Sequence, residues 1–234
     1  DDPMAKVYAA FRAPYSQPNG MQMTDEGLWV ADQVTDRCAL VETENVNRYG
    51  KTLVLREIDT ECSNTSGMTY GDDALWLAAN GPGAKYRPAR GTDFKSGATL
   101  KVDPHTGETL GHWPMPEEGG SHGIEFDNYE KGTMWVSTKG NSMTQLKIED
   151  RSVIKKLGLP HGRSHGVVRV EDGIWIAFTS DLVLIKFDID TNEEMDRIDI
   201  PESHPAPHGV SAYPGGFIYC DSSTGWIGVI EADV

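Results

Sequence analysis

The strongest constraint on the fold is a motif that recurs five times along the chain. Each copy contains a glycine and then an alternating stretch that ends in an aromatic or aliphatic residue. That residue follows the glycine by nine positions in four copies and by twelve in the third. The shared glycines are Gly20, Gly67, Gly123, Gly166 and Gly209, which are spaced by 47, 56, 43 and 43 residues. Repeat periods in this range are typical of propellers and solenoids.

Each copy predicts four short strands. The motif supplies two of them, and stretches such as "LVLIKFDID" and "ATLKVDPHTG" read as a third strand next to a tight turn. A fourth strand ends near a proline, as in "MDRIDIPES", and no segment has a convincing helical period. Four antiparallel strands repeated around an axis describe propeller blades. The sequence therefore predicts an all-β fold, a five-bladed β-propeller; a two-sheet sandwich is the alternative, but it would not require equal spacing.

The two ends of the chain predict how the propeller closes. The fifth copy stops after its third strand, "WIGVIEADV", and the leading segment "KVYAAFRAPYSQPNG" resembles an outer strand with its connecting loop. We expect the N-terminal strand to complete the last blade, which leaves few exposed sheet edges. We expect one domain over residues 4–234, with Met4 as the native start and residues 1–3 as an expression remnant.

Composition limits the partners. A net charge of −15 argues against nucleic acid or an anionic membrane surface, and no run of eighteen apolar residues predicts a membrane span. We expect a monomer that acts on a small molecule. The three cysteines, Cys38, Cys62 and Cys220, favour reduced thiols and a cytoplasmic location. A cleaved secretory signal would leave no trace here, so secretion stays open.

The residue before each shared glycine predicts the functional centre. These residues are Asn19, Ser66, His122, His165 and His208. Equivalent positions in a propeller converge on the mouth of the central channel. Three neutral imidazoles directed at one point match the pattern of a catalytic transition-metal site, so we expect a divalent metal ion, zinc first, with manganese, iron or nickel as alternatives. The alternative is a structural histidine copied by duplication.

Further candidates lie near the same mouth. The ends of the second strands give Asp32, Asn80, Lys139, Thr179 and Asp221. Asp221 would orient an imidazole or ligate the metal, and Lys139 would stabilise an oxyanion unless it forms a salt bridge. The preceding loops add His161, a proton-shuttle candidate, and Arg163.

A long insertion, residues 80–98, concentrates cations in an otherwise acidic chain. Long loops without a role are uncommon in compact domains, so we expect a lid that attracts an anionic or electron-rich substrate. A solvated flap is the alternative. The predicted substrate-binding residues are Lys85, Tyr86, Arg87 and Arg90, together with Asn19 and Asn80 at the mouth.

The unit "HGVVRVEDGIWIAF", continued by "LVLIKFDIDT", resembles the repeats of the streptogramin (virginiamycin B) lyase family. More distantly it is similar to gluconolactonase, paraoxonase and NHL-type propellers. The lyase resemblance implies that His208 acts as a base and that Asp221 helps to hold a divalent ion. That family has seven blades and a glutamate where this chain has Asp221. The three-histidine ring is similar to the zinc site of six-bladed peptidyl-hydroxyglycine amidating lyases. Plant-type glutaminyl cyclases are five-bladed, but their catalytic set does not match these residues.

Three functions follow. The first is a metal-dependent hydrolase of a carboxylic ester, lactone or phosphotriester, with Lys139 or Arg163 stabilising the oxyanion and Asp221 or Asp32 taking the proton. The second is a metal-dependent lyase, in which His208 or His161 removes a proton and a C–O bond breaks. The third is a propeller without enzymatic activity that binds a peptide or sugar.

Overall fold

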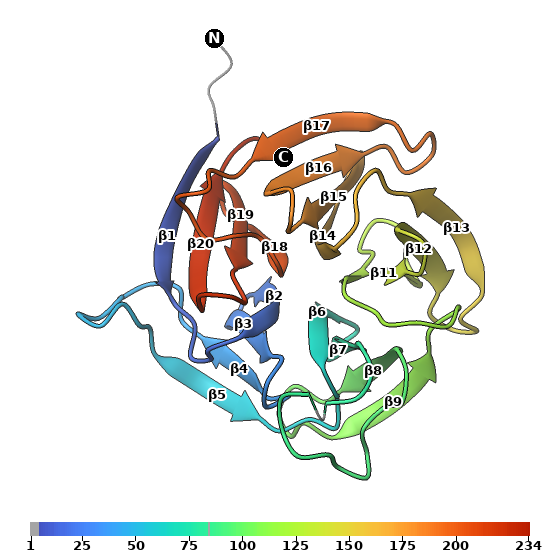
Figure 1. Ribbon diagram of the computed structural model, residues 1–234, viewed down its shortest axis with the longest axis horizontal. Coiled ribbons are helices and arrows are strands. Elements are labelled where there is room, and N and C mark those ends of the chain that lie inside the picture. Colours follow the sequence, from blue (N-terminus) through green and yellow to red (C-terminus); the bar gives the residue numbers. More distant parts are fainter. Residues whose placement is uncertain (1–4, 84) are drawn as a thin grey trace.

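The protein is a five-bladed β-propeller. The computed structural model describes residues 5–83 and 85–234, so the expectations for Met4 and residues 1–3 fall outside the described residues. These residues form five four-stranded antiparallel sheets arranged around one axis (Figure 1). They contain no helix, and hence none long and apolar enough to cross a membrane. The predicted fold class is confirmed.

The blades follow one another along the chain. The first comprises β2 (Pro18–Thr24), β3 (Gly27–Asp32), β4 (Cys38–Val41) and β5 (Val54–Ile58). The second comprises β6 (Thr65–Gly71), β7 (Ala74–Ala79), β8 (Ala98–Val102) and β9 (Thr109–Pro114). The third comprises β10 (Ile124–Phe126), β11 (Thr133–Thr138), β12 (Ser142–Lys147) and β13 (Val153–Gly158). The fourth comprises β14 (Ser164–Val170), β15 (Gly173–Phe178), β16 (Val183–Phe187) and β17 (Glu194–Asp199).

The fifth blade joins the two ends of the chain. Its strands β18 (Val210–Tyr213), β19 (Gly216–Cys220) and β20 (Trp226–Glu231) are completed by β1 (Lys6–Arg12). β1 pairs antiparallel with β20, from Lys6 opposite Glu231 to Arg12 opposite Trp226 (Figure 1). The predicted closure is therefore confirmed, and it stabilises the ring by pairing the otherwise free edge of β20.

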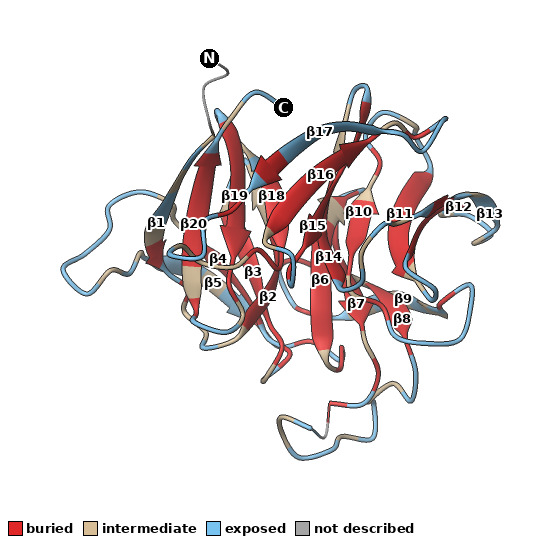
Figure 2. Ribbon diagram, turned by 45° about the horizontal axis from the view of Figure 1, so that its top comes forward, coloured by how far each residue is buried: buried red, intermediate tan, exposed pale blue. Residues whose placement is uncertain are grey.

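The hydrophobic core lies between adjacent blades. The aligned tryptophans sit in the second strands and are fully buried: Trp29, Trp76, Trp135 and Trp175. Trp29 packs with Leu75 and Leu77 of the next blade, and the other blade interfaces repeat this arrangement. Burial of such aromatic side chains supplies most of the packing energy of each interface. The outer strands are much more exposed, as β17 shows in Figure 2.

The inner strands touch at the shared glycines. A Cβ atom on Gly67 would collide with the carbonyl oxygen of His122, and one on Gly123 with that of His165. A Cβ on Gly166 would lie 2.6 Å from the carbonyl oxygen of His208. Only a cavity of about 10 Å³ remains on the axis at this level, enough for about one water. The channel is therefore narrow below its mouth, and glycine is required where the strands meet.

Replacing Gly67 with alanine should destabilise the propeller. The new methyl group meets rigid backbone, so two inner strands must move apart, at a cost of about 3 kcal/mol. Urea unfolding of Gly67→Ala measures this loss. Gly91→Ala is the matched control, because a Cβ there has no neighbour within 4 Å. Equal stabilities of the two variants would contradict the close contact.

Candidate active site

In three blades a β-bulge redirects the residue before the shared glycine. The pairing register shifts between Pro18 and Gly20 in β2 and between Thr65 and Gly67 in β6. A similar shift in β14 spans Ser164 to Val167. A bulge inserts one unpaired residue and redirects its side chain. Asn19, Ser66 and His165 occupy these bulged positions, so their side chains leave the regular alternation of the strand.

Local hydrogen bonds hold the other two histidines. The hydroxyl of Ser137 accepts hydrogen bonds from the backbone N–H groups of His122 and Gly123, at 2.9 and 2.7 Å. The backbone N–H of His208 donates to the carbonyl of Cys220 at 2.9 Å. These bonds join the start of each inner strand to the second strand of the same blade. Both imidazoles therefore have a fixed backbone anchor beside the axis.

The structure brings the three predicted imidazoles together. The ring centroids of His122 and His165 are 4.6 Å apart, and those of His165 and His208 are 5.2 Å apart. His165, the middle ring, is only 5% exposed. Burial of the ring, followed by repulsion from positive charge on His122, His208 and Arg163, lowers the pKa of His165 to about 2. Burial also lowers the pKa values of His122 and His208, so all three rings are neutral at pH 7.

The ring nitrogens differ in their hydrogen bonds. Nδ1 of His208 lies 3.4 Å from the carbonyl oxygen of Ala206 and 3.3 Å from the backbone nitrogen of Ser222. Nδ1 of His122 and of His165 is buried and has no hydrogen-bond partner among the described residues. Within the same residues, no three His, Cys, Asp or Glu side chains are gathered closely enough to hold a metal ion as they stand. The imidazoles are adjacent but do not form a ready-made metal site.

A pocket of about 530 Å³ opens above the imidazoles. It is lined by side chains from all five blades, three of them in the insertion: Gln17, Asn19, Gln33, Asn64, Asn80, Lys85, Tyr86, His122, Arg163, His165, His208, Ser222 and Ser223. The predicted substrate-binding residues Asn19, Asn80, Lys85 and Tyr86 are among them. The pocket therefore combines the mouth of the propeller with part of the predicted lid.

An amide network that the sequence did not reveal forms one wall of this pocket. Oε1 of Gln33 accepts hydrogen bonds from Nε2 of Gln17 at 2.7 Å and from Nδ2 of Asn19 at 3.0 Å. Nε2 of Gln33 donates to Oδ1 of Asn64 at 2.6 Å. Gln17 and Asn64 both lie three residues before a shared glycine, as Arg163 does in the fourth blade. The repeat register could have identified this second ring of positions.

The two predicted carboxylates, Asp32 and Asp221, accept hydrogen bonds from nearby backbone and hydroxyl groups. Oδ2 of Asp32 accepts hydrogen bonds from the backbone N–H and the hydroxyl of Thr35, at 3.0 and 2.7 Å. Oδ1 of Asp221 accepts from the N–H of Ser223, and Oδ2 accepts from the N–H of Ala206. The next residue, Gln33 or Ser222, lines the pocket instead. Asp221 still lies 3.9 Å from Nδ1 of His208, close enough to influence that ring.

The remaining predicted side chains divide between the pocket and its surroundings. Arg163 lines the pocket, and its Nη1 donates to the hydroxyl of Ser180 at 3.3 Å. His161 lies outside the lining, 3.8 Å from Asp181, with its ring edge-on to Phe178. Lys139 is exposed in the turn after β11 and also lies outside the lining.

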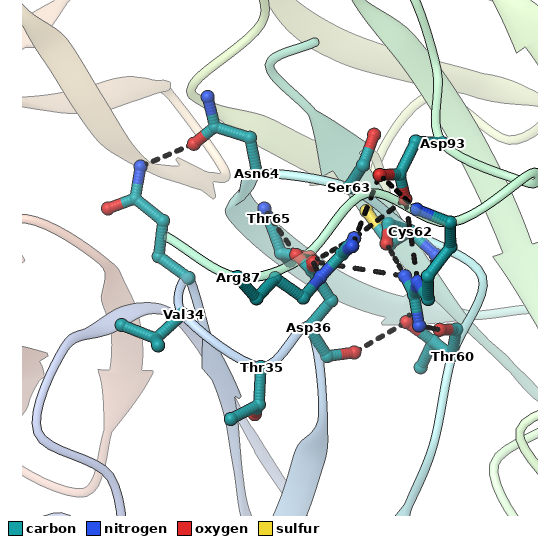
Figure 3. A network of polar contacts seen from close by, with 12 residues as sticks. Val34, Thr35, Asp36, Thr60, Cys62, Ser63, Asn64, Thr65, Arg87 and Asp93 are labelled. Carbon is teal, nitrogen blue, oxygen red and sulfur yellow. Dashed lines mark hydrogen bonds and ion pairs between the residues drawn. The ribbon is translucent and has the colours of Figure 1, made fainter. Parts of the chain in front are cut away.

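Arg87 and Arg90 anchor the insertion to the propeller, and Figure 3 shows Arg87 beside Asp36. Arg87 lies 2.7 Å from both Asp36 and Asp93, and Asp36 is completely buried. Arg90 donates to the carbonyl oxygens of Thr60 and Cys62, at 3.0 and 2.6 Å. The structure thus places these two guanidinium groups away from the pocket lining, because buried carboxylate and carbonyl oxygens occupy them.

A second polar layer lies deeper in the channel, two residues after the shared glycines. Its members are Gln22, Thr69, Glu125 and Ser211. Oε1 of Glu125 accepts from the hydroxyl of Thr69 at 3.0 Å, and Oε2 accepts from the N–H of Arg169 at 2.7 Å. Burial raises the pKa of Glu125 to about 8, so this carboxyl group is largely protonated at pH 7. Sequence reasoning missed it, although a glutamate within an inner strand was a visible signal.

Comparison with solved structures gives the same fold at low sequence identity. A glutaminyl cyclase from Myxococcus xanthus superposes with a TM-score of 0.65 at 11% identity, with 98% of each chain covered. A protein of unknown function from Bacteroides caccae superposes with a TM-score of 0.55 at 14% identity, and the alignment covers 87% of this chain and 70% of that one. The WD40 domain of Neurospora crassa Pan2 superposes with a TM-score of 0.52 at 10% identity, and the alignment covers 87% of this chain and 56% of that one.

No family model matches this chain, and no curated protein matches it by sequence. The structural neighbours are β-propellers, one of them named as an enzyme and others as WD40 domains. At such identities the likeness shows the fold alone. The resemblance to streptogramin lyases stays a prediction.

Replacing Glu125 with glutamine should change how stability depends on pH. The N–H of Arg169 requires an acceptor, which a neutral carboxyl group and an amide both supply. Either group can also donate a hydrogen bond to the hydroxyl oxygen of Thr69, in place of the bond that a carboxylate accepts from it. In the wild type the pKa of Glu125 rises from 4.5 in the unfolded chain to about 8 in the folded protein. The contribution of this carboxyl group to the free energy of unfolding is therefore fully present below pH 4.5 and is lost as the pH rises through 8. The variant should gain about 1.4 kcal/mol relative to wild type for each pH unit in that window. Urea unfolding at pH 5 and 8 measures the difference; parallel pH curves would contradict the protonated carboxyl.

Proposed function

We propose that the pocket is the active site of a metal-dependent hydrolase acting on a carboxylic ester, a lactone or a phosphotriester. The observation that carries the proposal is the set of three neutral imidazoles, side by side on the axis at the floor of an open pocket. Neutral imidazole is the ligand form that binds divalent transition metals. Buried groups with perturbed pKa values inside a pocket are also typical of catalytic sites.

The donor set fits a divalent ion in type. His122 and His165 each have a buried Nδ1 without a partner, and such an atom gains most from a ligand. Zinc is the first choice, and manganese, iron or nickel are the alternatives. The rings would have to turn about their Cβ–Cγ bonds to share one ion, because their nitrogens are not gathered as they stand. When bound, the ion would polarise the substrate oxygen and acidify a water molecule.

The surrounding residues supply the other functions of a hydrolase. Arg163 is the cation of the pocket wall beside the imidazoles, and it is suited to stabilise negative charge that develops on the substrate oxygen. Asp221 lies 3.9 Å from Nδ1 of His208 and raises the pKa of that ring against the effect of burial, so this carboxylate would orient the imidazole as a ligand. Lys139 and Asp32 have no part in this proposal, since one lies outside the lining and the other is bound within a turn.

A lyase is a second candidate, favoured by the 3.9 Å approach of His208 to Asp221 and by the family resemblance. In that reaction His208 removes a proton and a C–O bond breaks without addition of water. Oxygen from isotopically labelled water enters the product only in hydrolysis. A carbon–carbon double bond in the product is the signature of elimination.

A binding propeller without enzymatic activity is the third candidate. The absence of a gathered three-ligand group among the described residues favours it. In this case the pocket would bind the same small molecules without converting them, and no metal would accompany the purified protein.

Replacing His165 with alanine should abolish metal loading and activity while the propeller stays folded. His165 is the middle ring of the three, so its loss separates the other two. Elemental analysis should find about one divalent ion per wild-type chain, and turnover of p-nitrophenyl acetate, γ-butyrolactone or paraoxon should fall at least about a hundredfold in the variant. His105→Ala, in an exposed turn, is the control. Wild-type protein without metal, or unchanged turnover in His165→Ala, would contradict the proposal.

A further inference from the structure

The pocket differs in charge from the rest of the protein. The chain carries a net charge of −15, yet no aspartate or glutamate is among the described residues that line the pocket. Lys85 and Arg163 do line it. The carboxylates nearby are engaged elsewhere, since Asp36 pairs with Arg87 and Asp221 accepts two backbone N–H groups. The lining is therefore cationic on an acidic molecule, a combination that attracts anions.

The two cations of the lining remain available to a ligand. Arg87 and Arg90, the neighbouring cations of the insertion, are held by carboxylate and carbonyl oxygens. Lys85 is instead exposed, and its Nζ atom lies 5.3 Å from the centre of the Tyr86 ring. Arg163 is held by a single hydroxyl, that of Ser180. Its backbone is in the left-handed region, with φ 53°, as is that of Asn64 at the equivalent place in the second blade.

The amide wall has a different chemistry. Gln33 connects Gln17, Asn19 and Asn64 by hydrogen bonds, and Asn80 lines the same pocket. Each amide offers both donors and an acceptor, as a hydroxyl group does. Oδ1 of Asn19 is buried without a partner in the described structure. Such a wall complements a ligand with several hydroxyl groups, and the ring of Tyr86 adds a flat apolar surface beside it.

We infer that the pocket binds a small anion that carries several hydroxyl groups. Its charged group lies between Lys85 and Arg163, and its hydroxyl groups contact the amide wall. This inference rests on the proposed function, because it names the substrate class: an ester or lactone of a hydroxylated acid, whose reacting bond faces the imidazoles. Carboxylate and phosphate share the recognition chemistry, so both belong in the test.

Isothermal titration of EDTA-treated protein tests the inference apart from catalysis. The probes are gluconate, glucose 6-phosphate, glucitol and acetate. Glucitol has the hydroxyl groups of gluconate without its charge, and acetate has the charge without the hydroxyl groups. Gluconate or glucose 6-phosphate should bind at least about tenfold more tightly than both. The tighter of the two anions identifies the charged group. If neither anion binds more tightly than glucitol, the inference is overturned.

Variants locate the anion. Lys85→Met and Arg163→Asn should each weaken binding of the preferred anion about tenfold. Asparagine suits the backbone at position 163, because Asn64 holds the equivalent place in the second blade with φ 48°. Lys95→Met, an exposed lysine of the same insertion outside the lining, should leave the affinity unchanged. Equal losses in all three variants would indicate general electrostatics and overturn the inference. Anion binding without any turnover would instead overturn only the proposed function.

Discussion

The contact between five inner strands at the shared glycines determines the rest of this structure. Backbone meets backbone there, as Gly67 meets the carbonyl of His122 and Gly166 meets that of His208. A space of only about 10 Å³ is left at this level, so the channel narrows there and the pocket of about 530 Å³ lies above it. The residue before each glycine carries a side chain on the pocket side of this contact, as Asn19, His122, His165 and His208 show. Close packing of the backbone therefore places the imidazoles at the pocket floor.

Folding and function use different polar residues. The aspartates of the turns, among them Asp32, Asp103, Asp188 and Asp221, accept backbone N–H groups two or three residues later in the chain. Such bonds stabilise the turns between strands of a blade. The imidazoles make few comparable bonds, and two of them leave a buried nitrogen without a partner. Groups that cost stability without a structural benefit are expected at binding sites.

The repeat periodicity predicted the fold but not every residue that lines the pocket. The spacing of the glycines and tryptophans predicted the blades and the adjacency of the three histidines, and the two end segments predicted the closure. The ends of the second strands, however, predicted Asp32 and Asp221 at the mouth, whereas the residues that follow them, Gln33 and Ser222, line the pocket. The bulge and turn geometry that decides this offset has no simple sequence signature. The pairing of Arg87 with Asp36 joins residues 51 positions apart, so local pattern could not reveal it.

The central claim is that three imidazoles from consecutive blades act as one centre. Anomalous X-ray diffraction from crystals soaked in zinc tests it most directly, because the signal locates the ion independently of any activity. The account predicts one strong peak among the rings of His122, His165 and His208, with those rings turned toward it. Zinc bound only at surface carboxylates, with the three rings left in place, would contradict it.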